Sequence, residues 1–485
     1  MYIFIILHVF SFSFYKILVV RIRIRVNKKS FVNFIILFNM NILLFILLTL
    51  IYCLSYTHAK TRPASEIARV PPRGFSSWVT FRLYPNETLV KEIADVMNSS
   101  GLLSIGGYDI LWIDDGWSEC LSFESNGKCI EPAPRDNNGK IVPSATKFPN
   151  GMLALSNYVH SKGLKLGIYT AVSARTCGGY IGSLYNEVID ADTFINDWQL
   201  DAVKSDTCNT DCPIHTGCIQ NSTYIMWNAL DTLTERPIIY YIDSGNPTSP
   251  QRVYNPLNYH VSDLEAIYKL AINYKELVWN WAGISNTTVG VHAHMFKSWF
   301  DREDNWYSVL DNLHNQIRIA EYQTCGTFNM PDYLTIGMGG QSQEQYMAQF
   351  AAWVVLGAPL FISNDIRNMD NWTLNILTNT EALAINSDSL CIQGSQAMNF
   401  DATETWIKPL NDTSFAVAII NKDPIQTLNV TVSFESGGAF FPAAFLSAQV
   451  RDIFMKSNFS SISMNNFTVA IPPLGGRLYK VIPLS

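Results

Sequence analysis

The sequence has few charged residues and no excess of basic ones. Lys, Arg, Asp and Glu make up 15% of its 485 residues, and the net charge is −7 at pH 7, whereas about a quarter of residues are charged in ordinary soluble proteins. Nucleic-acid binding requires basic patches, so this composition argues against a nucleic-acid partner. Aromatic residues reach 13%. A weakly charged chain with many aromatic rings suits a neutral, flat-faced ligand.

The cysteines lack a regular CxxC pair, which zinc sites commonly contain. One of the nine cysteines, Cys53, lies in the apolar N-terminal region. The others form an even set, as a disulfide framework in a secreted protein would: Cys120, Cys129, Cys177, Cys208, Cys212, Cys218, Cys325 and Cys391. A zinc site formed by Cys208, Cys212 and Cys218 is the alternative.

The N-terminus carries two long apolar runs, residues 1–20 and 31–56, on either side of a basic stretch. The second run is followed by Thr57-His58-Ala59, an acceptable cleavage pattern for a secretory signal. We therefore expect residues 1–59 to be a hydrophobic leader, with the signal peptide at 40–59, and a secreted, lysosomal or vacuolar product. A retained membrane anchor is the alternative, because either run is nearly long enough to span a bilayer. Sequons for N-linked glycans agree with the secretory route: Asn86, Asn98, Asn221, Asn286, Asn371, Asn411, Asn429, Asn458 and Asn466.

Short apolar runs alternate with longer amphipathic segments from residue 71 onwards. Strands are predicted at 74–81, 108–117, 164–170, 201–206, 237–243, 294–301, 327–334 and 359–365. Helices are predicted at 87–101, 151–163, 187–198 and 342–357. Repeated strand–helix units predict a parallel sheet, and eight of them close a (β/α)8 TIM barrel. We expect this catalytic barrel to span 60–389.

The sequence pattern changes near residue 390. Short β-branched runs with alternating polarity occupy 413–423, 428–436 and 466–484, with turn residues between them. They predict a C-terminal antiparallel β-sandwich over 390–485. The expected fold class is therefore α/β, with a barrel followed by a sandwich.

Acidic residues stand at the ends of many predicted strands: Asp114, Asp115, Asp206, Asp243, Asp301 and Asp332. Chemistry in a barrel takes place where its strands end. A single aspartate there is commonly a turn or a helix cap, but so many in a chain poor in charge favour one shared site. Carboxylates that converge beside aromatic rings suit glycosidic-bond cleavage, in which one ionised carboxylate attacks the sugar and one carboxylic acid protonates the leaving oxygen.

Longer motifs resemble the melibiase family, glycoside hydrolase family 27, which contains α-galactosidases and α-N-acetylgalactosaminidases. The motifs are, in chain order, "PPRGFSSW", "ILWIDDGW", "RTCGGYIGS", "VKSDTC" and "GAPLFISNDIRNM". Residues 135–170 also follow the family nearly position by position. The resemblance covers most of residues 71–389. It implies a retaining glycosidase that needs no metal or organic cofactor.

The resemblance implies a role for each matching residue. Asp206 of the K-x-D-x-C motif would be the nucleophile, and Asp301 of "DREDNW" would be the acid/base. Lys204 would contact the sugar and favour the charged form of Asp206. The other implied sugar contacts are Trp78, Asp114, Asp115, Tyr169, Asp243, Lys297 and Asp332. A disulfide between Cys177 and Cys208 would hold the end of the nucleophile's strand.

Some positions depart from the family pattern. Lys297 stands where an arginine is usual, and a lysine cannot make the bidentate contact of an arginine. Asp243 takes the place of a glutamate. In the family that this chain resembles, both positions surround the C2 substituent that distinguishes galactose from N-acetylgalactosamine. Gly116 replaces a cysteine, which leaves Cys120 and Cys129 free to pair locally.

The segment between Asp243 and Asp301 is longer than in the family, with residues 259–288 as extra material. Because it follows a strand on the active-site face, we expect it to shape the aglycone side of the pocket. The leading function is hydrolysis of terminal α-linked galactosides by double displacement. The alternatives are an α-N-acetylgalactosaminidase, a β-arabinopyranosidase or an inactive sugar-binding relative. The expected partner is a carbohydrate, a homodimer is left open, and membrane contact is expected only if the leader is retained.

Overall fold

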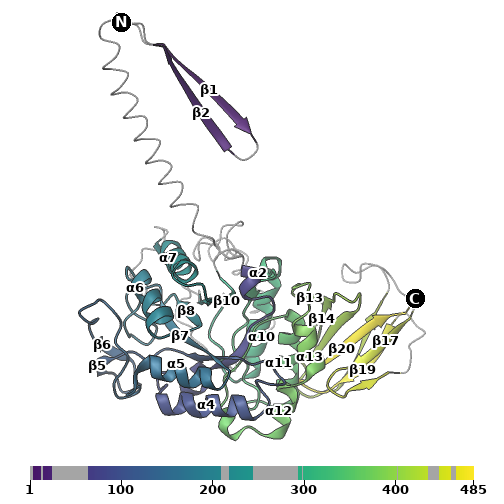
Figure 1. The fold of residues 1–485 in the computed structure, drawn as a ribbon. Coiled ribbons are helices and arrows are strands. Elements are labelled where there is room, and N and C mark those ends of the chain that lie inside the picture. Colours follow the sequence, from purple (N-terminus) through teal and green to yellow (C-terminus); the bar gives the residue numbers. More distant parts are fainter. Residues whose placement is uncertain are drawn as a thin grey trace, which may run out of the picture. The chain divides into compact units, whose positions relative to one another are not determined.

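The computed structural model describes residues 4–12, 15–23, 64–208, 218–243, 293–297, 299–400, 402–434, 447–459 and 466–484. The chain divides into two compact units, Met1–Lys60 and Thr61–Ser485. In the first unit, β1 (Phe4–Phe12) pairs antiparallel with β2 (Tyr15–Arg23) (Figure 1). The predicted signal peptide lies outside the described residues. Among the described helices, none is both long and apolar enough to cross a membrane.

Eight parallel strands form the central sheet of the second unit. They are β3 (Arg73–Ser76), β4 (Ile110–Ile113), β7 (Lys165–Ala171), β8 (Ala202–Asp206), β9 (Ile239–Asp243), β10 (Met295–Lys297), β11 (Phe328–Asn329) and β12 (Leu360–Ile362). Their order is β11-β10-β9-β8-β7-β4-β3-β12. A parallel bridge between Leu334 and Ile362 joins the two ends of this sheet. The predicted (β/α)8 barrel is confirmed, and every predicted barrel strand overlaps one of these eight.

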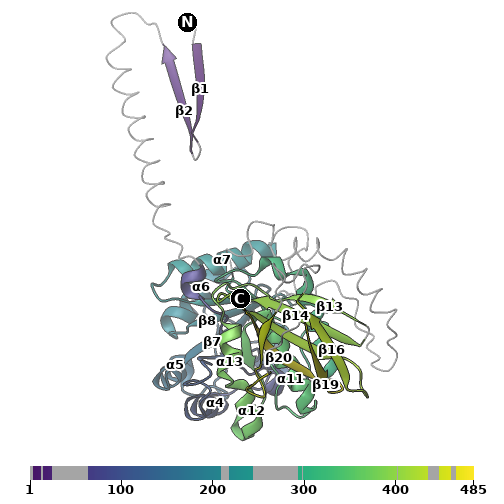
Figure 2. The same cartoon turned by 90° about the vertical axis from the view of Figure 1, so that its right-hand side faces the viewer.

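Most of the described helices follow a barrel strand and lie on the outside of the barrel (Figure 1). They are α2 (Ala64–Ile67), α3 (Trp78–Phe81), α4 (Glu87–Ser99), α5 (Gly151–Ser161), α6 (Glu187–Asp192), α7 (Cys218–Thr232), α10 (Trp306–Asn315), α11 (Gln343–Leu356), α12 (Asn371–Leu377) and α13 (Thr380–Asn386). Short 3-10 turns occupy Gln316–Arg318, Ala320–Tyr322 and Ile366–Asn368. In both views α4 and α5 lie side by side (Figures 1 and 2). Local sequence sets helix ends: Asn86 caps α4 by accepting from Leu89 N (2.9 Å), and Gly357 ends α11 with a φ of 61°.

Two predicted elements are wrong in part. The strand expected at 74–81 ends at Ser76 and gives way to α3. The Ser363 hydroxyl accepts a hydrogen bond from Val79 N (2.9 Å) and so holds the chain in this turn at the barrel rim. The helix expected at 187–198 is α6 followed by a π-helical turn, Thr193–Asp197, in which hydrogen bonds reach one residue further back than in an α-helix.

Large side chains fill the barrel interior below the strand ends. Trp112 on β4 lies edge-on against Tyr241 and Phe361, with ring centroids 5.9 Å apart in each pair. Gly167 on β7 leaves the space for this ring, because a Cβ there would lie 2.9 Å from it. The interior is therefore a packed core, and polar side chains can gather only at the open end where the strands finish.

The C-terminal part consists of antiparallel strands in two layers. They are β13 (Ser395–Asn399), β14 (Thr403–Pro409), β15 (Phe415–Asn421), β16 (Leu428–Ser433), β17 (Ala448–Asp452), β18 (Ser457–Asn458), β19 (Asn466–Ile471) and β20 (Gly476–Pro483). One sheet has the order β13-β14-β15-β20-β17-β18, and β16 pairs with β19 in the other. The predicted β-sandwich is confirmed.

Helix α11 packs the barrel against the sandwich. Alternate residues of β15 point to opposite faces of its sheet, so Ala416 and Ala418 pack into the core shared with the barrel, while Val417 packs between the two sheets. Strand β20 approaches α11 so closely that a Cβ at Gly476 would lie 2.5 Å from the backbone of Ala348. The barrel and the sandwich thus share a core within one compact unit. The predicted barrel–sandwich boundary falls between α13 and β13.

The disulfides among the described cysteines are Cys120–Cys129, Cys177–Cys208 and Cys325–Cys391. The first closes the hairpin of β5 (Cys120–Phe123) and β6 (Cys129–Pro132), which is the local pairing that the sequence left open. Because Cys208 is bonded to Cys177, it cannot serve as a zinc ligand, and the zinc alternative is wrong for this residue. Cys212 lies outside the described residues.

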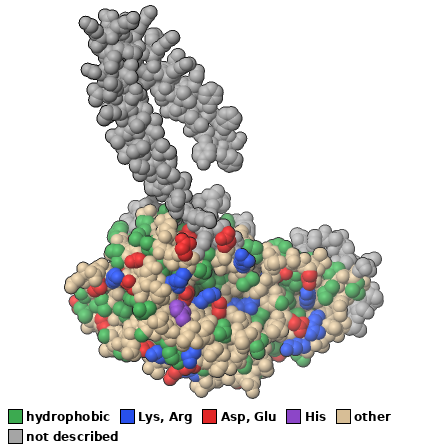
Figure 3. All heavy atoms as spheres, viewed as in Figure 1, with side chains coloured by type: hydrophobic (Ala, Val, Ile, Leu, Met, Phe, Trp, Pro, Cys, Tyr) green, Lys and Arg blue, Asp and Glu red, His purple; other side chains and the backbone are tan. Residues whose placement is uncertain are grey.

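Charged side chains are scattered over the face drawn in Figure 3. The described Lys and Arg residues lie there in small groups among acidic and neutral ones. This face therefore offers no broad basic patch formed by described residues, of the kind that nucleic-acid binding requires.

Candidate active site

The strand register brings predicted site residues into rows inside the barrel. Asp206 on β8 lies opposite Asp243 on β9, and Asp243 lies opposite Lys297 on β10. Two residues earlier in β8, Lys204 lies opposite Tyr241. Because alternate residues of a barrel strand face inward, the K-x-D spacing directs both side chains into the same interior.

Lys204 is the cation of the deeper row. Its side chain is buried, and its Nζ lies 3.2 Å from Asp114 Oδ2, 3.3 Å from Asp243 Oδ2 and 3.1 Å from the Tyr333 hydroxyl. Three tyrosine rings, with centroids 5.1 to 5.4 Å from Nζ, surround it: Tyr169, Tyr241 and Tyr333. Burial alone would lower the pKa of Lys204, but the adjacent carboxylates outweigh it and raise this pKa well above its usual value.

Lys297 joins three carboxylates at the mouth of the barrel. Its Nζ lies 3.0 Å from Asp243 Oδ2, 2.5 Å from Asp301 Oδ1 and 3.5 Å from Asp332 Oδ2. Asp243 therefore bridges the two buried lysines. Only 3% of the Lys297 side chain is exposed, against 53% of Asp301. Lys297 therefore links the solvent-exposed carboxylate of Asp301 to the buried carboxylates of Asp243 and Asp332.

Asp206, the predicted nucleophile, is buried at the end of β8. The Tyr169 hydroxyl donates to its Oδ2 (3.2 Å) and Thr207 N to its Oδ1 (2.6 Å). Burial and the negative charge of Asp243 raise the pKa of Asp206 well above its usual value. Lys204 acts in the expected direction, toward the charged form, but burial outweighs it. Asp206 therefore keeps its proton to a higher pH than an ordinary aspartate does.

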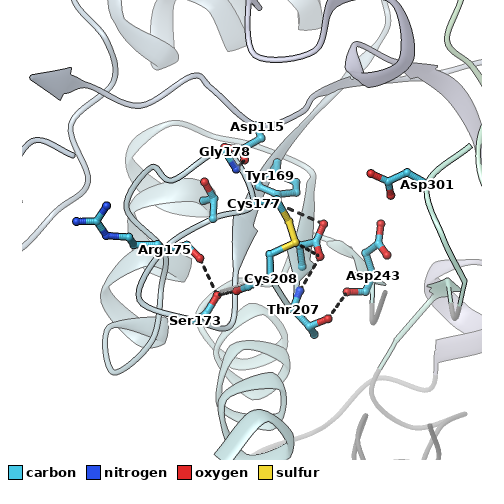
Figure 4. Close-up of a disulfide and its surroundings, with 12 residues drawn as sticks. Asp115, Tyr169, Ser173, Arg175, Cys177, Gly178, Thr207, Cys208, Asp243 and Asp301 are labelled. Atoms are coloured by element: carbon cyan, nitrogen blue, oxygen red, sulfur yellow. Dashed lines mark hydrogen bonds between the residues drawn. A yellow bond between two sulfur atoms is a disulfide. The ribbon is translucent and has the colours of Figure 1, made fainter. Parts of the chain in front are cut away.

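Asp301, the predicted acid/base, has the opposite shift. Partial removal from water would raise its pKa, but the positive charges of Lys297 and Lys204 lower it to about 2. Figure 4 shows Asp301 beside Asp243. Pairs of carboxyl groups with pKa values pushed apart are typical of acid/base sites. Here the two shifts run against the predicted roles, because the raised pKa belongs to the predicted nucleophile and the lowered pKa to the predicted acid.

Two of the other predicted carboxylates, Asp114 and Asp332, also lie beside the buried lysines. Asp114 accepts a hydrogen bond from the Tyr333 hydroxyl (3.2 Å). Asp332 accepts from Arg302 N (2.7 Å) and Tyr333 N (2.8 Å), and burial raises its pKa. Its φ of 73° is costly for a residue with a Cβ and is typical of functional sites.

Asp115 is buried, and its carboxylate accepts hydrogen bonds from the backbone. Gly178 N (2.6 Å) and Gly116 N (2.8 Å) donate to its two oxygens, and burial raises its pKa to about 6. These bonds join the end of β4 to the loop that carries Cys177. Whatever its contact with a sugar, Asp115 holds this loop in place.

The two predicted aromatic contacts differ in setting. Tyr169 is buried, and its hydroxyl is committed to Asp206. Trp78 is half-buried at the start of α3, and the Arg82 guanidinium lies 5.4 Å from its ring centroid. Trp78 is thus the more accessible of the two rings.

The Cys177–Cys208 disulfide, which the family resemblance implies, lies against Asp206. The Tyr169 hydroxyl is 3.1 Å from Cys177 Sγ, and the Ser173 hydroxyl donates to the Cys208 carbonyl. In Figure 4 Asp243 and Asp301 lie to one side of the disulfide and Arg175 to the other. The disulfide fixes the chain just after the predicted nucleophile. Since the two sulfurs are bonded to each other, they cannot join Asp206 in holding a metal ion.

Reasoning from the sequence missed Tyr241, Tyr333 and Arg302. Tyr241 stands two residues before Asp243, and that same-face spacing in a strand could have revealed it. Tyr333 reaches Lys204 from the other side of the barrel, a contact that no local pattern indicates. The predicted insertion after Asp243 lies outside the described residues, so its place at the aglycone side stays a prediction.

Comparisons with known proteins cover both parts of the chain. The family model described as alpha galactosidase A matches residues 84–289 and 283–388, and the model of the alpha galactosidase C-terminal beta sandwich domain matches residues 400–481. Alpha-galactosidase 2 of Arabidopsis thaliana is 32% identical over 415 residues, 85% of this chain and 89% of the relative. Alpha-galactosidase A of Homo sapiens is 31% identical over 402 residues, 79% of this chain and 82% of the relative.

The fold is also shared with solved structures. The crystal structure of alpha-galactosidase I from Mortierella vinacea aligns with a TM-score of 0.70 at 24% identity, over 86% of this chain and 98% of that one. At this identity the structural similarity establishes only the shared fold. Membership of the family rests on the sequence matches reported above.

Proposed function

The chain belongs to glycoside hydrolase family 27, the melibiase family of alpha-galactosidases, and from this premise we propose that it hydrolyses terminal α-linked galactosides with retention of configuration. The observation that supports this most directly is geometric: the barrel gathers two carboxyl groups at its mouth, with Asp206 opposite Asp243 in the strand register and Lys297 joining Asp243 to Asp301. A retaining glycosidase needs two such carboxyl groups, one as nucleophile and one as acid/base.

In the proposed reaction, Asp206 attacks the anomeric carbon while Asp301 gives its proton to the leaving oxygen. The glycosidic C–O bond breaks, an ester forms between the sugar and Asp206, and the alcohol departs neutral. Water then attacks the anomeric carbon of this ester, the bond between that carbon and the Asp206 oxygen breaks, and the water's proton passes to Asp301. Tyr169 and Thr207 N, both hydrogen-bonded to Asp206, steady the carboxylate as its charge changes.

The reacting form must carry its proton on Asp301, although the shifts favour Asp206. We propose that the sugar reverses this preference. A hydroxyl that takes a hydrogen bond from Lys297 loosens its 2.5 Å contact with Asp301, which raises the proton affinity of Asp301. A sugar that displaces water above Asp206 brings the developing positive charge of the anomeric carbon beside it, which favours the carboxylate.

Galactose is proposed over N-acetylgalactosamine because of Asp243. This carboxylate is buried between Lys204 and Lys297 at 3.3 and 3.0 Å, in the region that the family resemblance assigns to the C2 substituent. A hydroxyl can exchange hydrogen bonds with such a charged pair. The methyl group of an acetamide could not supply these hydrogen bonds, so it would lie against buried charged groups without compensation.

The test is turnover of nitrophenyl glycosides of α-galactose, α-N-acetylgalactosamine and β-arabinopyranose, with Asp206→Asn as the control. We expect α-galactoside to be cleaved fastest and Asp206→Asn to lose turnover while it keeps its fold by circular dichroism. Faster cleavage of either other glycoside would replace the proposed substrate. Galactose binding without cleavage of any would favour the sugar-binding alternative, and ordinary activity in Asp206→Asn would remove its role as nucleophile.

We also propose that the chain follows the secretory route to a secreted, lysosomal or vacuolar destination. Several sequon asparagines are exposed among the described residues: Asn98, Asn221, Asn371, Asn411, Asn429 and Asn458. Disulfides between distant cysteines also suit an oxidising compartment. Mass spectrometry of the mature N-terminus should find a chain that starts after Ala59, and a retained leader would favour a membrane anchor.

A homodimer stays a prediction that sedimentation analysis tests.

A further inference from the structure

A shallow hollow lies on the outside of the barrel between α6 and α7. Its volume is about 580 Å³, within the range of ~300–1,000 Å³ that small-molecule sites show. Apolar side chains line it and reach solvent: Val188 is 50% exposed and Ile189 40%. Tyr185 lies on its edge and is 83% exposed. We call this surface the α6–α7 hollow.

Tyr185 is held in a costly position. Its φ is 64°, a conformation that bulky residues seldom adopt and that persists only where the surroundings enforce it. The enforcing group is Glu187, a buried carboxylate that accepts hydrogen bonds from Tyr185 N (3.2 Å) and from the Ser222 hydroxyl of α7. One side chain thus fixes both walls of the hollow and presents an aromatic ring to solvent.

The hollow also contains a glycosylation sequon. Asn221 of Asn-Ser-Thr lines it, and its side chain is exposed. The neighbouring Ser222 is the residue bound by Glu187. A similar pairing occurs in a second hollow, of about 620 Å³, where the sequon residue Asn86 stands beside Tyr84, which is 55% exposed. The exposed sequon residues Asn371 and Asn411 line neither hollow.

From this arrangement we propose that Asn221 carries an N-linked glycan whose first sugars pack in the α6–α7 hollow against Tyr185. The first residue of such a glycan, N-acetylglucosamine, has a C–H face and an acetyl methyl group that match an aromatic ring beside Val188 and Ile189. Its attachment to Asn221 keeps it next to the hollow at a high effective concentration, so even a weak contact is occupied. The proposal rests on the secretory route proposed above and not on the glycosidase activity.

The test uses the full chain from a eukaryotic secretory host. Glycopeptide mass spectrometry should find a glycan on Asn221. Endoglycosidase treatment of the folded protein should release this glycan about five- to tenfold more slowly than those on Asn371 and Asn411, the ratio that a contact of ~1–1.4 kcal/mol gives. Tyr185→Ala should abolish the difference. Ile425→Ala, which removes an 81% exposed apolar side chain from the sandwich, should preserve it.

An Asn221 without glycan, or a glycan released as fast as the other two, would overturn the proposal. So would protection that survives Tyr185→Ala. Hydrolysis of nitrophenyl α-galactoside, measured on the same samples, should be equal in all variants. A failure of the proposed activity can therefore be told apart from a failure of this proposal.

Discussion

Lys297 contacts Asp243, Asp301 and Asp332 at once, and its ammonium group acts on the proton affinity of both proposed catalytic carboxyls, most strongly on that of Asp301. The positive charge of Lys297 lowers the pKa of Asp301 and also opposes the rise in the pKa of Asp206. An arginine would present a planar fork with several donors, whereas a lysine acts as a compact point charge. The charge of this side chain, more than its shape, should therefore determine its effect on the pKa values of Asp206 and Asp301.

The first prediction concerns this charge. In Lys297→Met, both carboxyl groups lose a nearby cation, so each holds its proton to a higher pH. Both limbs of the kcat/KM profile against pH should move to higher pH, with kcat/KM at its optimum reduced at least about tenfold for the lost charged hydrogen bonds. Lys297→Arg keeps the charge and should keep the limbs. A profile in Lys297→Met that overlays that of the unmodified enzyme would contradict this view.

The second prediction concerns Lys204, whose buried ammonium balances Asp114 and Asp243. Lys204→Met leaves these carboxylates with less compensation in a dry site. Breaking a buried ion pair from one side costs about 3–5 kcal/mol, and we expect a loss of that order in the free energy of unfolding from urea titration. Lys140→Met, which breaks a partly exposed pair with Asp197, is the control and should change little. Equal effects in both variants would refute the argument.

Single residues of the site differed in how far the sequence could predict them. Asp206 and Lys204 share the K-x-D spacing of a strand, so their common direction followed from the backbone alone. The sign of the pKa shift of Asp206 did not follow, because it depends on burial and on Asp243, which belongs to another strand. The contact between Tyr333 and Lys204 could not be predicted either, because only the closed barrel brings these two distant residues together.

At the scale of elements, the strands were predictable because each is a short apolar run bounded by turn residues. Their order in the sheet followed from the repeated strand–helix pattern. The α3 turn was not predictable, since Ser363, far along the chain, holds it. The Cys325–Cys391 disulfide was also unassigned, because an even set of cysteines does not state its pairs.

The two longer disulfides provide the third prediction. Cys177–Cys208 closes a loop of 31 residues beside Asp206, and Cys325–Cys391 closes one of 66 residues that starts before β11, away from the strand ends that carry the site. Chain entropy gives each about 4 kcal/mol of stabilisation. Replacing either pair with serines should therefore lower the Tm. Only the loss of Cys177–Cys208 should also lower kcat/KM on α-galactoside, since it releases the chain after Asp206. Equal activity in both variants would show that the disulfide does not position the nucleophile.

The whole molecule holds a set of buried acids whose titration should govern its stability. Burial raises the pKa of Asp115 to about 6, and it raises the pKa values of Asp206 and Asp332 as well. Glu404, buried between the barrel and the sandwich, is shifted the other way. Its burial is outweighed by His314 (2.6 Å) and Lys422 (3.0 Å), which lower its pKa to about 2.

These shifts have opposite consequences for stability. A carboxyl whose pKa is raised on folding stabilises the native state below its unfolded pKa of ~4, and this contribution is lost as the pH rises through the folded value. A carboxyl whose pKa is lowered stabilises above ~4, and its contribution is lost as the pH falls toward the folded value. The two contributions overlap most near the unfolded pKa of ~4, where both are large but neither is complete. His294 opposes the raised acids, because burial lowers its pKa to about 3 and the native state binds fewer protons there below pH ~6.5.

The fourth prediction is an acidic optimum of stability. Between pH ~4 and ~6 Asp115 binds more protons in the native state than in the unfolded chain, the raised pKa values of Asp206 and Asp332 act in the same direction, and the lowered pKa of His294 opposes them. We therefore expect stability to fall as the pH rises toward neutrality. The net negative charge above the sequence pI of 5.6 acts in the same direction. Calorimetric Tm values measured from pH 3 to 8 should peak near pH ~4–5. For Asp115 alone the change from pH ~4 to ~7 amounts to about 2 kcal/mol, so Asp115→Asn should flatten the decline even if it lowers the Tm at every pH. A Tm that climbs steadily to pH 7.5, or an unchanged slope in Asp115→Asn, would show that these buried acids do not control stability.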